Sequence, residues 1–152
     1  DLIIKKNCTK SMINLHKRHK CSVMASMKVN KKTVSRWGIY KLEKNLDKNN
    51  FIINDVIEKP SIKDAPSNNA VIGRYILPKK IYQTLLTTKP GKGGELHITD
   101  AIRHLINNNE KFIAHNFSGK YLDCGSMHGY INSCVEISKI WNFVWLELVM
   151  LV

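Results

Sequence analysis

Hydrophobic and polar positions along this chain follow two periods, which predicts strands interleaved with helices. Besides the end of a strand at residues 1–4, short apolar runs rich in β-branched residues predict six strands: 21–27, 37–40, 51–57, 70–77, 111–117 and 121–125. Apolar residues at helical spacing predict four helices, two of them N-capped by Thr9 and Thr99, one after Pro78, and one from Ser126 to Lys139. The alternation favours an α/β layer architecture around a mostly parallel sheet.

The strand predicted over residues 51–57 runs into Glu58, Lys59 and Pro60. Pro60 cannot donate to a sheet ladder, so it stops the strand and holds the acid and the base at the rim of the sheet. Neighbouring side chains of a strand point to opposite faces, so Glu58 and Lys59 can serve two parts of one ligand. An exposed ion pair before a turn fits the same residues.

Three further features admit both a functional and a structural explanation. Gly38 lies inside a predicted strand, where it marks either a close approach of a ligand to the backbone or a bulge without function. Asp123 stands at the end of a short strand, where it either serves a site or caps the following helix. The glycine- and lysine-rich stretch 88–95 lacks the Gly-Lys-Ser/Thr sequence of a P-loop, so it is weak evidence for phosphate binding.

Composition narrows the class of protein and of ligand. The 152 residues suffice for one domain, and 24 Lys and Arg against 12 Asp and Glu favour an anionic partner, either nucleic acid or a phosphorylated small molecule. The sequence has no recognisable nucleic-acid-binding motif, so the nucleic-acid interpretation depends on charge alone. Neither zinc-ligand spacing nor a signal peptide accompanies the four cysteines, which favours reduced thiols in a cytoplasm: Cys8, Cys21, Cys124 and Cys134.

The last 13 residues differ from the rest, because only Asn142 and Glu147 are polar in the stretch 140–152. Such a run is too short to span a bilayer, which needs about 20 apolar residues, so we expect no membrane span. The tail is therefore predicted to pack on its own domain, to pack on a partner, or to form an exposed apolar patch.

A set of short motifs runs along residues 1–139. The motifs are Cys21-Ser22-Val23, Ser35-Arg36-Trp37-Gly38-Ile39, Ile57-Glu58-Lys59-Pro60, Ala65-Pro66-Ser67-Asn68, Val71-Ile72-Gly73-Arg74-Tyr75-Ile76-Leu77, Thr88-Lys89-Pro90-Gly91, Gly93-Gly94-Glu95, Thr99-Asp100-Ala101-Ile102, Tyr121-Leu122-Asp123-Cys124-Gly125 and Gly129-Tyr130. In order and approximate spacing, they closely resemble the carboxyl-terminal half of bacterial UTP-glucose-1-phosphate uridylyltransferase, also called UDP-glucose pyrophosphorylase. Each motif is weak alone, and the ordered set is highly specific.

The resemblance implies a role for each candidate residue of the sugar site. Glu58 accepts hydrogen bonds from sugar hydroxyls, Lys59 is the catalytic cation that meets the phosphate of glucose 1-phosphate, and the backbone of Gly38 lies against the sugar. Glu95 and Asp100 border the sugar pocket, although Asp100 also has a structural explanation as an acidic residue in the first turn of a helix.

The resemblance also implies a metal site, a reaction and a fold. Asp123 is implied to bind Mg²⁺ near the phosphates, and Asp1 to belong to a second acidic metal-binding motif. The implied reaction converts UTP and glucose 1-phosphate to UDP-glucose and pyrophosphate. Orientation of the substrates and neutralisation of their phosphates by cations promote this reaction. The implied fold is a Rossmann-like nucleotide-diphosphosugar transferase fold with a mixed, mostly parallel sheet and flanking helices.

Two departures from the family shape the remaining expectations. Nothing before Asp1 supplies the family's glycine-rich nucleotide-binding loop, so we expect a chain truncated at the amino end and inactive alone. Residues 1–139 form the sugar-phosphate-binding part, and 140–152 replace a more polar helical segment with an atypical apolar tail. A non-catalytic remnant or sugar-nucleotide-binding module, and a related sugar-phosphate nucleotidyltransferase, remain alternatives. Members of this enzyme class commonly form homo-oligomers, and the sequence leaves the oligomeric state open.

Overall fold

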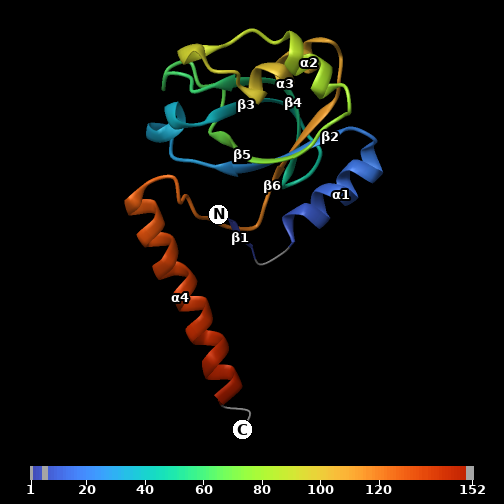
Figure 1. Cartoon of the computed structure of the whole chain (residues 1–152). Helices are drawn as coiled ribbons and strands as arrows, with labels where there is room; N and C mark the ends of the chain where they lie inside the picture. Colours follow the sequence, from blue (N-terminus) through green and yellow to red (C-terminus); the bar gives the residue numbers. More distant parts are fainter. Residues whose placement is uncertain (1, 5–6, 150–152) are drawn as a thin grey trace. The chain divides into compact units, whose positions relative to one another are not determined.

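The computed structural model describes residues 2–4 and 7–149 (Figure 1). The chain divides into two compact units. The barrel unit comprises residues 7–117, and the helical unit comprises residues 1–6 with 118–152. Each unit is described by itself.

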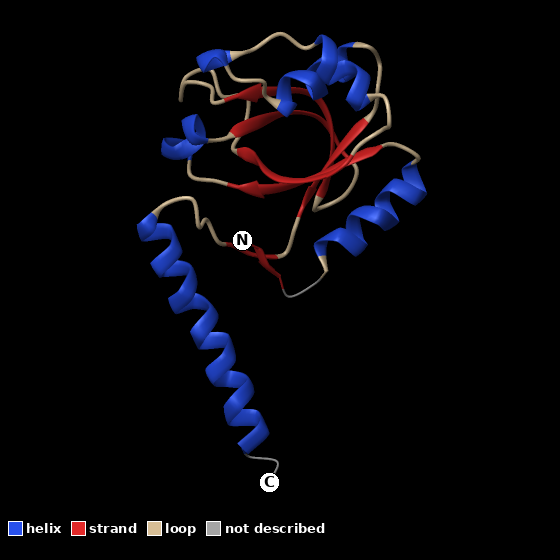
Figure 2. Cartoon of the chain, in the orientation of Figure 1, coloured by secondary structure: helices blue, strands red, loops and turns tan. Residues whose placement is uncertain are grey.

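Five strands of the barrel unit form one closed sheet in the order β2-β5-β3-β4-β6 (Figure 2). The strands are β2 Ser22–Lys28, β3 Gly38–Asn45, β4 Asn50–Glu58, β5 Asn69–Ile76 and β6 Phe112–Asn116. The sheet is mixed and helices flank it, as predicted. It is not mostly parallel, because only β2 and β6 run parallel and the other pairings are antiparallel. Apolar runs identify strands but not their direction, and β3 and β4 are joined directly by a tight turn, which makes them antiparallel.

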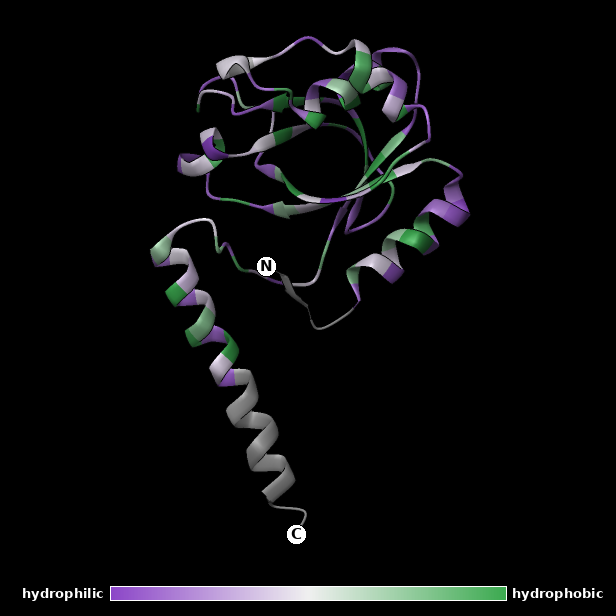
Figure 3. Cartoon of the chain, in the orientation of Figure 1, coloured by the Kyte–Doolittle hydropathy of each residue, from purple (hydrophilic) through white to green (hydrophobic). Residues whose placement is uncertain are grey.

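The helices of this unit pack against different strands of the barrel. Helix α1 (Cys8–His19) packs along β2 and β5, whereas α3 (Ile98–Asn107) packs along β4 and beside the short α2 (Ile81–Thr87). The buried side of α3 joins strand residues in the main core, which includes Met24, Tyr40, Ile53, Val56, Phe112, Ala101, Ile102 and Leu105. The carboxyl-terminal end of α1 is strongly hydrophilic (Figure 3) and carries His16, Lys17, Arg18 and His19, which suits the negative end of the helix dipole.

The predicted helices exist, but both predicted threonine caps are wrong. Asn7 caps α1 in place of Thr9, because its side-chain oxygen accepts a hydrogen bond from the N–H of Lys10 at 3.0 Å. His97 occupies the N-cap position of α3, and Thr99 lies inside the first turn. Helix ends vary by one or two residues, so sequence alone places the start only to within that range.

The helical unit contains a small sheet and a long helix. Strands β1 (Leu2–Ile4) and β7 (Gly119–Tyr121) pair antiparallel, and α4 runs from Met127 to Val149. The strand predicted over 121–125 is therefore wrong beyond Tyr121. Among the described residues, no helix is both long and apolar enough to cross a membrane. The contacts predicted for the apolar tail fall on side chains from residue 140 onward, outside the described side chains.

The turn between β3 and β4 yields a prediction about stability. The Asp47 carboxylate accepts hydrogen bonds from the backbone N–H groups of Asn49 and Asn50 and from the Asn50 side chain, at 2.7–3.0 Å. These hydrogen bonds, the Asn50 side chain first, lower the pKa of Asp47. We expect Asp47→Ala to lower the free energy of unfolding by about 1 kcal/mol at pH 7, measured by urea denaturation.

The same pKa shift fixes the sign of the pH dependence. Because the pKa of Asp47 is lower in the folded chain than in the unfolded one, its contribution is complete above the unfolded pKa and is lost as the pH falls through the folded pKa. The two proteins should therefore converge in stability under acid conditions. Lys48→Ala, in the same exposed turn, is the control, and an equal loss in both variants would contradict the assignment.

Candidate functional site

The hairpin of β3 and β4 brings two candidate residues face to face. Gly38 begins β3 and pairs directly with Glu58, which ends β4. The ladder continues one step further, because the N–H of Lys59 donates to the carbonyl of Trp37 at 3.0 Å. Strand pairing therefore fixes the backbone at this end of the hairpin.

A third element reaches the same point. The Thr99 hydroxyl, in the first turn of α3, donates to Oε2 of Glu58 at 2.9 Å. Thr99 is 4% exposed and Glu58 is half-buried. A Cβ at Gly38 would lie 3.0 Å from Glu58 Oε2 and 3.2 Å from Thr99 Cγ2. The missing side chain of Gly38 thus leaves room for the carboxylate and the threonine, which explains this glycine by close packing.

Lys59 occupies an unusual backbone conformation. Its φ of 44° lies in the left-handed region, which non-glycine residues rarely adopt, and its side chain is exposed. Lys59 lies just beyond β4, so strand alternation does not set its direction relative to Glu58, contrary to the sequence argument. Such conformations cluster at functional sites, where the surrounding structure maintains them.

Asp100 and Glu95 lie near each other through the loop that precedes α3. The N–H of Gly91 donates to the carbonyl of Glu95 at 2.9 Å, and a Cβ at Gly91 would overlap Oδ2 of Asp100. Asp100 follows Thr99 in the first turn of α3, so the start of this helix contacts both the end of β4 and the 88–95 loop. The start of α3 therefore contacts Glu58 through Thr99 and the 88–95 loop through Asp100, and the contact of Glu95 in this loop is made by its backbone carbonyl.

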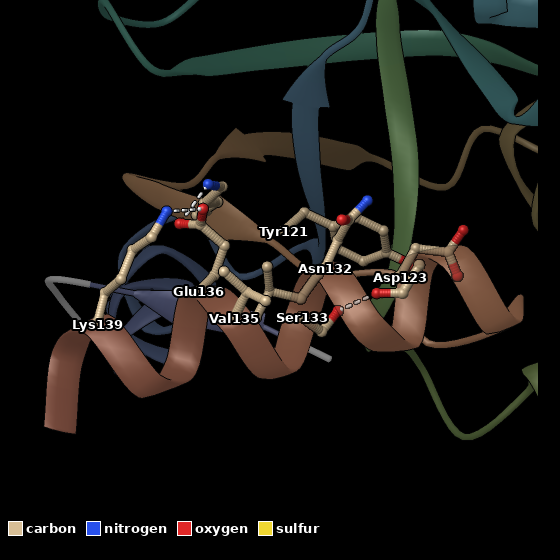
Figure 4. Close-up of a pocket in the computed structure, with 10 residues that line it drawn as sticks. Tyr121, Asp123, Asn132, Ser133, Val135, Glu136 and Lys139 are labelled. Carbon is tan, nitrogen blue, oxygen red and sulfur yellow. Dashed lines mark hydrogen bonds and ion pairs between the residues drawn. The ribbon is translucent and has the colours of Figure 1, made fainter.

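Asp123 belongs to the helical unit, where it lines a groove between β7 and α4 (Figure 4). The groove has a volume of about 540 Å³. Oδ1 of Asp123 accepts a hydrogen bond from the N–H of Gly125 at 3.0 Å, and the Ser126 hydroxyl accepts one from the N–H of Gly129 at 3.1 Å. Ser126 therefore caps α4, and Asp123 does not.

Charged groups gather at the other end of this groove. Glu136 forms ion pairs with Lys120 and Lys139, at 2.6 and 3.0 Å, and hydrogen bonds to these two lysines lower its pKa. Burial raises the pKa of Tyr121, and the nearby charge of Asp123 raises it further. The groove thus has an acidic end at Asp123 and a net positive end, where Lys120 and Lys139 both pair with Glu136.

The predicted metal site and the predicted shared cleft stay predictions. Among residues 2–4 and 7–149, no group of three or more His, Cys, Asp or Glu is placed to hold a metal ion. Asp1 lies outside the described residues. Asp123 and the Gly38–Glu58 pair belong to different units.

Thr99 is the residue that sequence reasoning missed as a site residue. A helix often starts at a threonine that precedes an acidic residue and an apolar run with helical spacing. The pattern therefore predicts that the Thr99 hydroxyl caps the helix. The only other signal was its place in the Thr99-Asp100 motif.

Comparisons with known proteins give a consistent result. The family described as "Nucleotidyl transferase" matches residues 1–139. The chain is 40% identical to a UTP–glucose-1-phosphate uridylyltransferase of Pseudomonas aeruginosa over 130 residues, which are 84% of this chain and 46% of that protein. It is 34% identical to UTP–glucose-1-phosphate uridylyltransferase 1 of Staphylococcus saprophyticus over 129 residues, 85% of this chain and 44% of that protein.

Solved structures agree with these sequence matches. A UDP-glucose pyrophosphorylase complexed with UDP-glucose superposes with a TM-score of 0.84 at 40% identity, over 91% of this chain and 52% of that one. The UTP-bound enzyme of Acinetobacter baumannii gives a TM-score of 0.76 at 26% identity, over 97% and 53% of the two chains. The resemblance inferred from the motifs is confirmed, and the chain spans about half the length of the curated relatives it matches.

The packing around Gly38 predicts the effect of adding one methyl group. An alanine Cβ would lie 3.1 Å from Val71 Cγ2 as well as close to Glu58 and Thr99. We expect Gly38→Ala to lower the free energy of unfolding by about 1–3 kcal/mol, as overpacked cores do, measured by urea denaturation. The cost should shrink in a Val71→Ala background, where space is available. Equal costs in both backgrounds would exclude the Val71 contact as a cause of the loss.

Gly129 gives the corresponding prediction for the helical unit. A Cβ there would overlap the backbone carbonyl oxygen of Asp123, which cannot rotate away as a side chain can. We expect Gly129→Ala to separate α4 from the Asp123 loop and to speed limited proteolysis between residues 119 and 139. Gly125→Ala is the control, because its Cβ would meet only the Asp123 side chain, at 3.1 Å. Unchanged proteolysis of Gly129→Ala would contradict this close packing.

Proposed function

The chain belongs to the nucleotidyl transferase family, and from this membership we propose that it carries the sugar-phosphate-binding half of a UTP–glucose-1-phosphate uridylyltransferase. The whole protein would transfer the uridylyl group of UTP to glucose 1-phosphate, which forms UDP-glucose and releases pyrophosphate. The likeness to curated and solved UDP-glucose pyrophosphorylases supports the choice of substrates.

The convergence of β3, β4 and α3 at Glu58 carries this proposal. A carboxylate oriented by a buried threonine is suited to accept hydrogen bonds from sugar hydroxyls. Gly38 keeps the backbone beside it free of a side chain, and Glu95 and Asp100 would line the approach from the 88–95 loop. Groups held in this way orient a bound sugar before reaction, which is one of the largest contributions available to an enzyme.

Lys59 would bring positive charge to the phosphate of glucose 1-phosphate. In the transfer, an oxygen of this phosphate attacks the α-phosphorus of UTP while the bond to pyrophosphate breaks. Two anions must approach each other, so a cation at the meeting point lowers their repulsion and stabilises the transition state. The charge distribution supports this role, because residues 7–117 hold 20 of the 24 Lys and Arg but only 8 of the 12 acidic residues.

Asp123, together with Asp1, is the proposed holder of Mg²⁺. The donor set fits, because Mg²⁺ is usually bound by one or two carboxylates together with water and substrate phosphates rather than by a cage of protein ligands. One oxygen of Asp123 accepts from Gly125, and this contact fixes the orientation of the carboxylate at the groove. When bound, Mg²⁺ would neutralise phosphate charge.

Location and assembly complete the proposal. We place the protein in the cytoplasm, in line with four free cysteines, since thiols persist in a reducing compartment. UDP-glucose made there would serve polysaccharide biosynthesis. We propose that the complete protein forms a homo-oligomer. We also propose that the chain of 152 residues alone is inactive, because the family's glycine-rich loop is the segment that would bind the UTP triphosphate.

Binding of UDP-glucose to the 152-residue chain tests the proposal. We expect calorimetry with UDP-glucose and Mg²⁺ to detect binding, and Lys59→Ala to weaken it at least tenfold, the effect of losing a charge-assisted hydrogen bond. Lys63→Ala, an exposed lysine in the next loop, is the control and should bind like the unmodified chain. Equal affinities for Lys59→Ala and the unmodified chain would refute the role of Lys59, and no binding by the unmodified chain would refute a sugar-nucleotide site in it.

A further inference from the structure

We propose that Thr99 is a positioning residue, which fixes the carboxylate of Glu58 for the sugar without touching the sugar itself. This inference rests on the proposed function, because it gives a role to a residue that acts through Glu58.

The threonine is placed to restrict the carboxylate. Its hydroxyl donates to Oε2 of Glu58 at 2.9 Å, and its methyl group Cγ2 faces the space above Gly38. A β-branched side chain has few rotamers, so the buried methyl group fixes the direction of the hydroxyl. The methyl group therefore limits the rotamers of Thr99, and the hydroxyl is the group that contacts the carboxylate oxygen.

The position of Thr99 in the helix frees its hydroxyl for this contact. A threonine inside a helix usually donates to the carbonyl three or four residues before it. For Thr99 these residues precede α3, which begins at Ile98. The hydroxyl therefore reaches across to β4 instead of back along its own helix.

A second contact holds α3 and β4 together. Arg103 lies one turn after Thr99, and its guanidinium binds the Asp55 carboxylate through two contacts, of 2.9 and 3.1 Å. Residues four apart share one face of a helix, so Thr99 and Arg103 both point to β4. Because the bidentate pair fixes the spacing of the two elements, a change at Thr99 should alter the carboxylate and leave the backbone in place.

Loss of the hydroxyl should therefore affect ligand binding more than folding. The Glu58 side chain has several rotatable bonds, and without the Thr99 donor it would sample orientations that do not meet a sugar hydroxyl. Valine has nearly the shape of threonine and keeps the methyl group over Gly38. Serine keeps the donor and loses that methyl group.

Calorimetry with UDP-glucose and Mg²⁺ on the full 152-residue chain tests the proposal. We expect Thr99→Val to weaken binding about fivefold to tenfold, with little change in the urea midpoint, and Thr99→Ser to bind within about twofold of the unmodified chain. Thr87→Val is the matched control, because the Thr87 hydroxyl donates to carbonyls of its own helix. In a Glu58→Ala background, Thr99→Val should have no further effect. Unchanged binding by Thr99→Val, a serine variant as weak as the valine variant, or an additive effect with Glu58→Ala would each overturn the proposal.

A readout without ligand separates this inference from the proposed function. In NMR spectra, nuclear Overhauser contacts between the Glu58 methylene protons and Gly38 should be strong in the unmodified chain and in Thr99→Ser, and weak in Thr99→Val. Equally strong contacts in Thr99→Val would refute the positioning role, whatever the ligand result. Ordered contacts in an unmodified chain that binds no UDP-glucose would instead refute the proposed function and leave the orientation of Glu58 by Thr99 as a structural fact.

Discussion

The register of β3 against β4 is the constraint on which the candidate sugar site depends. A slip of one residue would turn every side chain of a strand to the opposite face, which would move Glu58 away from Gly38 and Thr99. The pairing is regular from Gly38 opposite Glu58 to Lys41 opposite Asp55, and the irregularities lie beyond it, toward the turn. The part of the hairpin that holds the site is therefore its most regular part.

Packing of α3 links this register to the hydrophobic core. Ala101, Ile102 and Leu105 are buried in the same cluster as Tyr40 and Val56, so the helix cannot move without opening the barrel. Its first turn and its exposed face then have fixed positions relative to the end of β4. Packing in the hydrophobic core thus fixes the positions of these polar groups, although the polar groups contribute little to that packing.

Sequence periodicity predicted most of the strands and helices. It predicted neither the direction of the strands nor the partners of polar side chains. Apolar runs located β2, β4, β5 and β6 to within one or two residues, because buried strands need such runs. The same apolar runs do not indicate the direction of a strand, so the prediction of a mostly parallel sheet was wrong. The partner of a hydroxyl is also a tertiary property, which is why Thr99 was assigned to a helix cap and its contact with Glu58 was found only in the structure.

The conformation of Lys59 bears on whether its position is structural or functional. A left-handed backbone is unfavourable for a residue with a side chain, by about 1 kcal/mol, and glycine would remove that cost. The hydrogen bond from the Lys59 N–H to the carbonyl of Trp37 helps to hold this conformation, because it continues the strand pairing by one step. Backbone conformation alone would favour glycine over lysine at this position. Lysine places an exposed cation beside Glu58, which is the property that the proposed sugar-phosphate site requires.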